Sequence, residues 1–215
     1  MSRIAIIGGH GKVALHLAKK LSGDHQQVSS VIRNPDHADD VTATGAQPVV
    51  ADVENSDIDA LAQLLVDHDA VVFAAGAGGG SPARTYAVDR DAAIRVVDAA
   101  KQAGARRFVM VSYFGAGPDH GVPEDNSFYA YAQAKAAADE HLKASGLDWT
   151  ILGPGGLTLD DATGKITVGA EAAEGKVSRE DVALVAAAVL ADDSTIGRTI
   201  EFNTGDTPIA EAIKA

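Results

Sequence analysis

Short apolar runs alternate with longer amphipathic stretches along most of the chain. The apolar runs are rich in Val, Ile and Ala, and they predict strands at 3–8, 27–33, 48–51, 70–75, 107–112, 148–152 and 199–204. Stretches with helical spacing of their apolar residues predict helices at 13–21, 57–66, 84–103, 127–145 and 179–190. Strands that alternate with helices form parallel sheets, because each helix crosses over the sheet in the same right-handed sense. The pattern therefore predicts an α/β fold, with a doubly wound, mostly parallel sheet between two layers of helices.

A chain of 215 residues is long enough for one domain with a sizeable core. The sequence shows no internal repeat and no low-complexity linker, so we expect a single domain over 1–215. The least regular stretch is 154–178, which is rich in Gly, Thr and Asp. We expect this stretch to form a small lid over a substrate; a long surface connection is the alternative.

Composition narrows the classes of partner. The formal net charge is −12, from 30 Asp and Glu against 18 Lys and Arg, which opposes binding to nucleic acid or to an anionic membrane. The absence of cysteine excludes disulfides, thiolate metal ligands and cysteine nucleophiles, and the seven histidines are too scattered to predict a metal site. No signal-peptide pattern or membrane-length apolar run is present. We expect a cytoplasmic protein, monomeric or homodimeric, whose partner is a small molecule.

A glycine-rich turn near the N-terminus is the most informative motif. Residues 4–14 read IAIIGGHGKVA, a β-branched run followed by glycines and the start of a helix. Gly8, Gly11 and Ala14 have the spacing G-x-x-G-x-x-A, a variant of the dinucleotide fingerprint, in which the turn brings a diphosphate to the helix N-terminus. The rival phosphate motif G-x-x-x-x-G-K-[ST] fails, because Ile6 and Val13 occupy its first and last positions. The turn predicts a bound dinucleotide; an ordinary connection between strand and helix is the alternative.

The end of the second predicted strand favours NADP over NAD. In such folds an acidic residue at this point holds the ribose 2′-hydroxyl of NAD, whereas an arginine accommodates the 2′-phosphate of NADP. The chain has Arg33 here, and Lys12 in the first helical turn adds a second positive charge. Asp52 and Val53 follow the third predicted strand, so we expect them near the adenine. The alternative for Asp52 is that it caps the helix that follows.

Three residues further along the chain form a candidate catalytic group. Ser112 ends the fifth predicted strand, and Tyr131 and Lys135 lie four residues apart on the following helix, so their side chains share a face. A neighbouring ammonium lowers the pKa of a phenol, and a tyrosine beside a lysine can then exchange a proton with the oxygen of a carbonyl compound. Ser112 would donate a hydrogen bond to the same oxygen. Tyr129 is the alternative to Tyr131, but the residue four positions after it is Gln133, which carries no charge.

With these motifs the chain resembles the atypical short-chain dehydrogenase/reductases, in particular their compact NAD(P)H-binding, NAD-dependent epimerase/dehydratase-like bacterial members. The segments that carry the resemblance are 8–11 (GGHG), 33–35 (RNP), 74–76 (AAG), 108–112 (FVMVS), 135–139 (KAAAD), 145–150 (SGLDWT), 154–158 (PGGLT) and 178–183 (SREDVA). The resemblance extends over nearly the whole length and implies a Rossmann fold with bound NAD(P). The cofactor contacts assigned by the resemblance and the motifs together are Gly8, His10, Gly11, Lys12, Val13, Arg33, Asp52, Val53, Ala74, Ala75, Gly76, Lys135 and Pro154.

Two positions depart from the family pattern. Relatives usually carry an arginine before the Pro-Gly-Gly segment, where this chain has Gly153, and many have a second serine where it has Tyr113. We predict an NADP-dependent oxidoreductase that acts on an unidentified small carbonyl or related compound. A non-catalytic redox sensor that binds NAD(P)H is the alternative. A nucleotide-sugar epimerase is less favoured, because only 154–178 are available for a substrate lobe.

Overall fold

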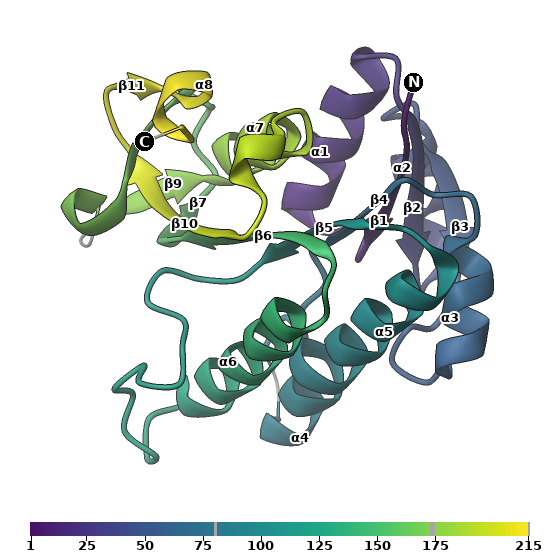
Figure 1. Cartoon of the computed structure of the whole chain (residues 1–215), viewed down its shortest axis with the longest axis horizontal. Helices are drawn as coiled ribbons and strands as arrows, with labels where there is room; N and C mark the ends of the chain where they lie inside the picture. The colour runs from purple at the N-terminus through teal and green to yellow at the C-terminus, as the bar shows by residue number, and fades with distance from the viewer. Residues whose placement is uncertain (80, 173–174, 215) are drawn as a thin grey trace.

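The first strand of the chain, β1 (Arg3–Ile7), lies inside the central sheet, between β2 (Gln27–Ile32) and β4 (Ala70–Phe73). The computed structural model describes residues 1–79, 81–172 and 175–214, and its nine-stranded sheet has the order β11-β8-β10-β6-β5-β4-β1-β2-β3 (Figure 1). The other strands of this sheet are β3 (Gln47–Val50), β5 (Arg107–Val111), β6 (Asp148–Pro154), β8 (Lys165–Val168), β10 (Arg198–Thr204) and β11 (Thr207–Pro208). Neighbours from β3 to β10 pair in parallel, whereas β8 is antiparallel to β10 and β11. The predicted doubly wound, mostly parallel Rossmann sheet is confirmed.

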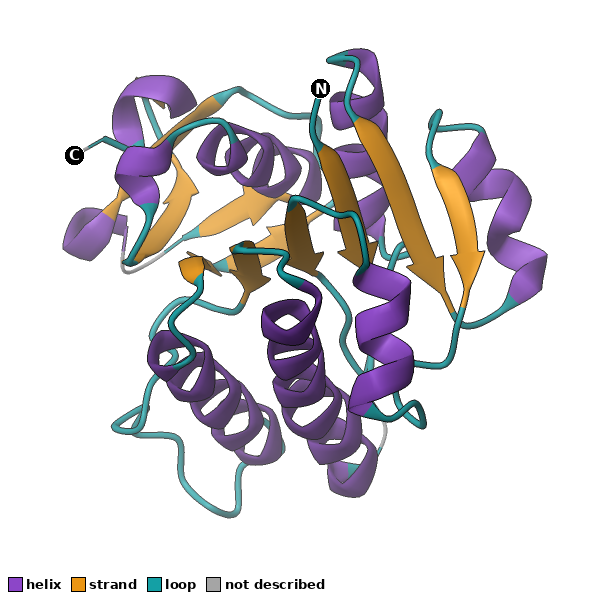
Figure 2. Ribbon diagram, turned by 45° about the vertical axis from the view of Figure 1, so that its right-hand side comes forward, coloured by secondary structure: helices purple, strands orange, loops and turns teal. Residues whose placement is uncertain are grey.

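Helices cover both faces of the sheet, as predicted. Figure 1 shows α1 and α7 on one side and α5 and α6 on the other, and Figure 2 shows the sheet as a layer between the two groups. One group consists of α1 (Lys12–Gly23), α2 (Ala38–Thr42), α7 (Arg179–Leu190) and α8 (Ile209–Ala212). The other group consists of α3 (Ile58–Leu65), α5 (Ala93–Ala103) and α6 (Tyr129–Ala144). These two layers of helices leave the carboxyl ends of the strands open as the place for a ligand.

Burial on both faces explains why β1 reads as an unbroken apolar run. Ile4 and Ile6 face the cluster around α1 and α7, while Ala5 and Ile7 face the cluster around α3 and α5. Successive side chains of a strand point to opposite faces, so a strand covered on both faces has no polar side. Burying each isoleucine stabilises the fold by roughly 1.5–3 kcal/mol, which holds the strand rigidly before the glycine turn.

The helix predicted at 84–103 begins earlier and is not uniform. It comprises α4 (Pro82–Thr85), a π-helical segment η2 (Tyr86–Ala92) and α5. Ser81 caps the start, because its hydroxyl accepts the Arg84 amide at 3.4 Å, and proline stands at the first helical position. The π segment contains the buried Asp89, and π-helical segments occur often at functional sites.

The stretch 154–178 contains more regular structure than its composition predicted. Besides β8 it forms β7 (Gly156–Thr158), the short helix η3 (Gly169–Ala172) and β9 (Lys176–Ser178). β7 and β9 pair with each other in a separate two-stranded sheet. These strands depend on partners distant in sequence, so local residue preferences gave no signal for them. The role of the stretch as a substrate lid stays a prediction.

The remaining short elements, which the apolar pattern did not predict, are the 3-10 helices η1 (Pro35–His37) and η4 (Asp193–Thr195). In the part of the chain that the structure describes, no helix combines the length and the apolar character needed to cross a membrane.

Candidate cofactor and substrate site

The turn after β1 requires glycine at its first position. Gly8 has a φ of +84°, and a Cβ at this residue would lie 2.5 Å from the Cα of Ala75, at the end of β4. The Gly11 amide donates to the Gly8 carbonyl at 2.9 Å, which closes the turn. The backbone of the turn after β1 therefore passes against the segment after β4 with no room for a side chain.

The N-terminus of α1 is open to an anion. Gly11 is the residue that caps it, and no side chain accepts a hydrogen bond from its first turn, which also contains no acidic residue. A helix start of this kind presents free N–H groups and the positive end of the helix dipole. A first cavity, of about 290 Å³, lies against this turn and beyond the ends of β2, β3 and β4. Together these features suit a diphosphate.

Most of the predicted cofactor residues line the first cavity. Those that do are Gly8, His10, Gly11, Arg33, Asp52, Val53, Ala74, Ala75 and Gly76. Four predicted residues are not among its lining residues: Lys12, Val13, Lys135 and Pro154. Lys12 is exposed and Pro154 is buried at the end of β6. The predicted set lacks eight other lining residues: Val31, Ile32, Asn34, His37, Ala51, Glu54, Arg84 and Val88.

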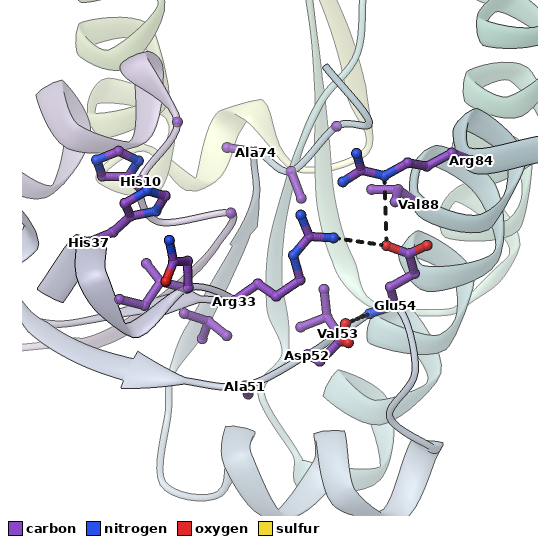
Figure 3. A pocket seen from close by; sticks show the side chains of 17 residues that line it. His10, Arg33, His37, Ala51, Asp52, Val53, Glu54, Ala74, Arg84 and Val88 are labelled. Atoms are coloured by element: carbon purple, nitrogen blue, oxygen red, sulfur yellow. Dashed lines mark hydrogen bonds and ion pairs between the residues drawn. The ribbon is translucent and has the colours of Figure 1, made fainter. Parts of the chain in front are cut away.

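Arg33 and Arg84 converge on one carboxylate at the edge of the first cavity. Figure 3 shows them reaching Glu54 from different directions. Arg33 Nη1 lies 3.3 Å and Arg84 Nε 4.0 Å from Glu54 Oε2. The Arg33 side chain is 57% exposed, whereas that of Glu54 is 23% exposed. Among the described residues, Glu54 is the ion-pair partner of Arg33, and an exposed ion pair of this kind contributes little to the position of the arginine.

Two histidines stack at another edge of the same cavity (Figure 3). The rings of His10 and His37 have centroids 3.6 Å apart and an angle of 15° between their planes. His10 Nε2 lies 2.8 Å from Asp40 Oδ2. The ring of His10 is thereby fixed beside the glycine turn, where the sequence predicted it.

Asp52 bonds within the turn that follows β3. Its oxygens accept the Glu54 amide at 3.1 Å and the Asn55 side chain at 2.8 Å. The hydrogen bond from Asn55 is the main cause that lowers the pKa of Asp52, with a further contribution from Arg33. The cap of α3 is a different residue, Asp57, so the alternative of a helix cap at Asp52 is wrong.

A second cavity, of about 440 Å³, meets the first at Gly76. Its walls come from the glycine-rich segment after β4, from α4 and η2, and from the start of α6. Asp89 and Tyr131 are among its lining residues. Asp89 Oδ2 accepts the Ala77 amide at 3.0 Å, and burial raises the pKa of the Asp89 carboxyl. Nothing local in the sequence singled out Asp89, because its orientation depends on the π segment.

Ser112 and Lys135 are buried and have internal partners. Ser112 Oγ donates to Asp139 Oδ2 at 2.5 Å, and Lys135 Nζ donates to the Val111 carbonyl at 2.8 Å. Burial lowers the pKa of Lys135 and raises that of Asp139. Asp139 was not among the predicted site residues, although it follows Lys135 by four positions and so shares its helix face.

Tyr131 is a neutral phenol in this structure. Burial is the main cause that raises its pKa above the usual value, and the charge of Asp89 raises it further. The lowered pKa that we expected from Lys135 is not found, since the lysine side chain turns to Val111. The Tyr131 ring packs at centroid distances of 5.6 Å from Tyr113 and 5.1 Å from Phe128. Proton donation, which requires the neutral phenol, is the chemistry that this environment favours.

The alternative tyrosine has other neighbours. The Tyr129 hydroxyl accepts from the Gln133 side chain at 3.2 Å, and its ring meets that of His120 edge to face. Tyr129 is not a lining residue of either cavity.

The two departures from the family pattern lie close together. A Cβ at Gly153 would lie 3.0 Å from the Glu201 side chain and 3.2 Å from the Tyr113 carbonyl. Glu201 Oε1 accepts the Gly115 amide at 2.7 Å, so it also ties the segment after Tyr113 to β10. A side chain at position 153 would therefore need these neighbours to shift by a few tenths of an ångström.

Comparisons with known proteins agree with this geometry. The family model described as NAD(P)H-binding matches residues 8–193. The chain is 35% identical to the uncharacterized sugar epimerase YhfK of Bacillus subtilis over 215 residues, 99% of each chain. A solved NAD-dependent epimerase/dehydratase-like protein of Bacillus halodurans is similar at 35% identity and a TM-score of 0.91, over 100% of this chain and 99% of the other. The oxidoreductase ylbE of Lactococcus lactis is similar at 30% identity and a TM-score of 0.87, over 99% and 95%. The chain therefore belongs to the NAD(P)H-binding family, whose Rossmann-like structures include epimerase/dehydratase-like proteins and oxidoreductases of the short-chain dehydrogenase/reductase type.

Proposed function

We propose that this protein is an NADP-dependent oxidoreductase that acts on a small carbonyl compound. One observation carries the proposal: the first cavity, with its glycine turn and arginines, meets at Gly76 a second cavity bordered by the Tyr131 phenol. A dinucleotide held across the carboxyl ends of the strands would have its adenosine in the first cavity. Its nicotinamide end would then be directed toward the second.

The residues of the first cavity fit this cofactor. The uncapped start of α1 suits the diphosphate, and the contact between Gly8 and Ala75 leaves the turn without a side chain that would obstruct it. Arg33 supports the choice of NADP, because its exposed guanidinium can turn from Glu54 to a 2′-phosphate. Arg84 supplies a second cation at the same edge.

The cofactor, when bound, supplies the hydride. Tyr131 would donate its phenolic proton to the carbonyl oxygen as negative charge develops there. Lys135, one helical turn away, would turn its ammonium from the Val111 carbonyl to offset the charge left on Tyr131. Ser112 would turn its hydroxyl from Asp139 to donate a hydrogen bond to the same carbonyl oxygen of the substrate. Ser112, Lys135 and Asp139 are buried, and these buried surroundings would strengthen the interactions.

A second candidate function is supported by a specific observation. Ser112 Oγ and Lys135 Nζ are both engaged by protein groups rather than directed at Tyr131. A protein with this arrangement could bind NADP(H) and signal its redox state without turnover. This is the non-catalytic sensor considered from the sequence.

Isotope transfer separates the two functions. The protein would be incubated with NADPH carrying deuterium at the transferable position of C4 and with a panel of aldehydes and ketones. The enzyme function predicts deuterium at the carbonyl carbon of an alcohol product. Saturable NADPH binding without deuterium transfer to any panel member would favour the sensor.

A further inference from the structure

The described lining of the second cavity is acidic rather than basic. Among its lining residues that the structure describes, Asp89 is the one with a charged side chain, and none is lysine or arginine. Asp89 is 1% exposed. Its hydrogen-bond partner is the Ala77 amide; burial raises the pKa of the carboxyl, and the charges of Lys135 and Arg84 counter that rise without a hydrogen bond to it. An anionic group in the cavity would therefore lie beside a buried carboxyl with no adjacent cation to neutralise it.

The wall formed by the start of α6 is aromatic. Phe128 and Tyr131 line the cavity, and the Phe128 ring meets Tyr113 edge to face at a centroid distance of 5.0 Å. Phe128 is 41% exposed, so part of its ring is free for a ligand. Aromatic side chains pack well against the edge or face of another ring. A volume of about 440 Å³ is in the range of small-molecule sites.

We infer that the second cavity binds an uncharged aromatic aldehyde or ketone and discriminates against anionic compounds, sugar nucleotides included. This inference rests on the proposed function and names the substrate class of the same site. The reaction balances with one reduced nicotinamide. Its hydride forms a C–H bond at the carbonyl carbon, the electron pair of the C=O π bond moves to oxygen, and that oxygen takes the Tyr131 proton. The products are the alcohol, the oxidised nicotinamide and a phenolate that solvent reprotonates.

A matched pair of ligands tests the charge argument by binding. Calorimetry would compare 4-nitrobenzaldehyde, which is neutral, with 4-carboxybenzaldehyde, which is an anion of similar shape, and with UDP-glucose, each with and without saturating NADP. We expect the neutral aldehyde to bind at least about tenfold more tightly than the carboxylated one. Equal or tighter binding of the carboxylated aldehyde or of UDP-glucose would overturn the inference, as would binding of neither aldehyde.

Charge insertion provides the second arm. Ser127→Arg places a cation in the lining of the second cavity, and Ser194→Arg makes the same change at an exposed position in η4, away from it. Ser127→Arg should improve binding of the carboxylated aldehyde by about tenfold, while Ser194→Arg leaves both affinities unchanged. Phe128→Ala should weaken binding of the neutral aldehyde when it is added to Ser127→Arg or to Ser194→Arg. If both arginine variants behave alike, the second cavity is not the site.

Cofactor titrations keep this result separate from the proposed function. NADPH binding that persists while no aldehyde binds contradicts the substrate class alone. Selective binding of the neutral aldehyde without turnover supports the cavity assignment and contradicts the catalytic role.

Discussion

Arg33 Nη1 lies 3.3 Å from Glu54 Oε2, so the cation assigned to the 2′-phosphate of NADP already has a carboxylate partner. Arg33 directly follows β2, and Glu54 lies in the turn after the neighbouring strand β3. Glu54 would compete with the phosphate for Arg33 and would repel it as a like charge. The choice between NADP and NAD should therefore depend on Glu54 as much as on Arg33.

Glu54→Gln should raise the ratio of NADP affinity to NAD affinity by about three- to tenfold, because the competing charge is removed. Titration calorimetry with both oxidised cofactors measures the ratio. Glu211→Gln, the same change on the exposed surface of α8, serves as the control and should leave it unchanged. A ratio that is equal in the wild type and Glu54→Gln would show that Glu54 plays no part in the choice.

Gly8→Ala should destabilise the protein by at least about 2 kcal/mol, since the added Cβ meets the Ala75 backbone and φ is positive. Cofactor binding should be lost with it. Gly23→Ala is the matched control, because nothing lies within 4 Å of a Cβ at that position in α1. Urea unfolding of the two variants gives the comparison; similar free energies of unfolding would contradict the close approach of Gly8 to the Ala75 backbone.

Tyr131→Phe should lower kcat by about a hundredfold or more, since it removes the proton donor and leaves the ring in place. The melting temperature and the NADPH affinity should stay near the wild-type values. Tyr129→Phe removes a hydroxyl from the same helix, where its partner is Gln133, and should retain activity. Full activity in Tyr131→Phe would exclude Tyr131 as the donor.

The pH dependence of stability should report on Asp139. Burial raises the pKa of its carboxyl, so the folded state holds the proton more tightly than the unfolded state. The resulting stability is fully present below the ordinary carboxyl pKa and is lost as pH rises through the raised value. Asp139→Asn does not titrate, so its free energy of unfolding should fall less over that range.

Urea unfolding at a series of pH values would measure this difference. Asp125→Asn, an exposed change before α6, should follow the wild type. If the Asp139→Asn curve runs parallel to that of the wild type, ionisation of Asp139 does not limit stability.

The sequence predicted the glycine turn and the doubly wound sheet because both depend on local patterns. Gly8 and Gly11 stand between a buried strand and a helix. The apolar run, the glycines and the helical spacing all predict the same strand, turn and helix. The position of the first cavity could be predicted as well, because the carboxyl ends of parallel strands meet at one edge of the sheet.

Contacts between distant segments could not be predicted in the same way. Glu54 meets Arg33 and Arg84 only because the turn after β3 faces the start of α4 across the first cavity. Lys135 shares a helix face with Tyr131, as the spacing predicted, yet its length lets the ammonium reach the Val111 carbonyl instead. Asp89 lines the second cavity from a π-helical segment, which no residue pattern predicted.

Titration calorimetry of the wild-type protein and Arg33→Ala with NADPH and NADH tests the central claim most directly, namely that the first cavity binds a nicotinamide dinucleotide with its adenosine end toward Arg33. The account predicts saturable binding of NADPH by the wild type and a loss of about tenfold or more in Arg33→Ala, with a smaller change for NADH. Absence of binding for both cofactors at millimolar concentration would contradict it.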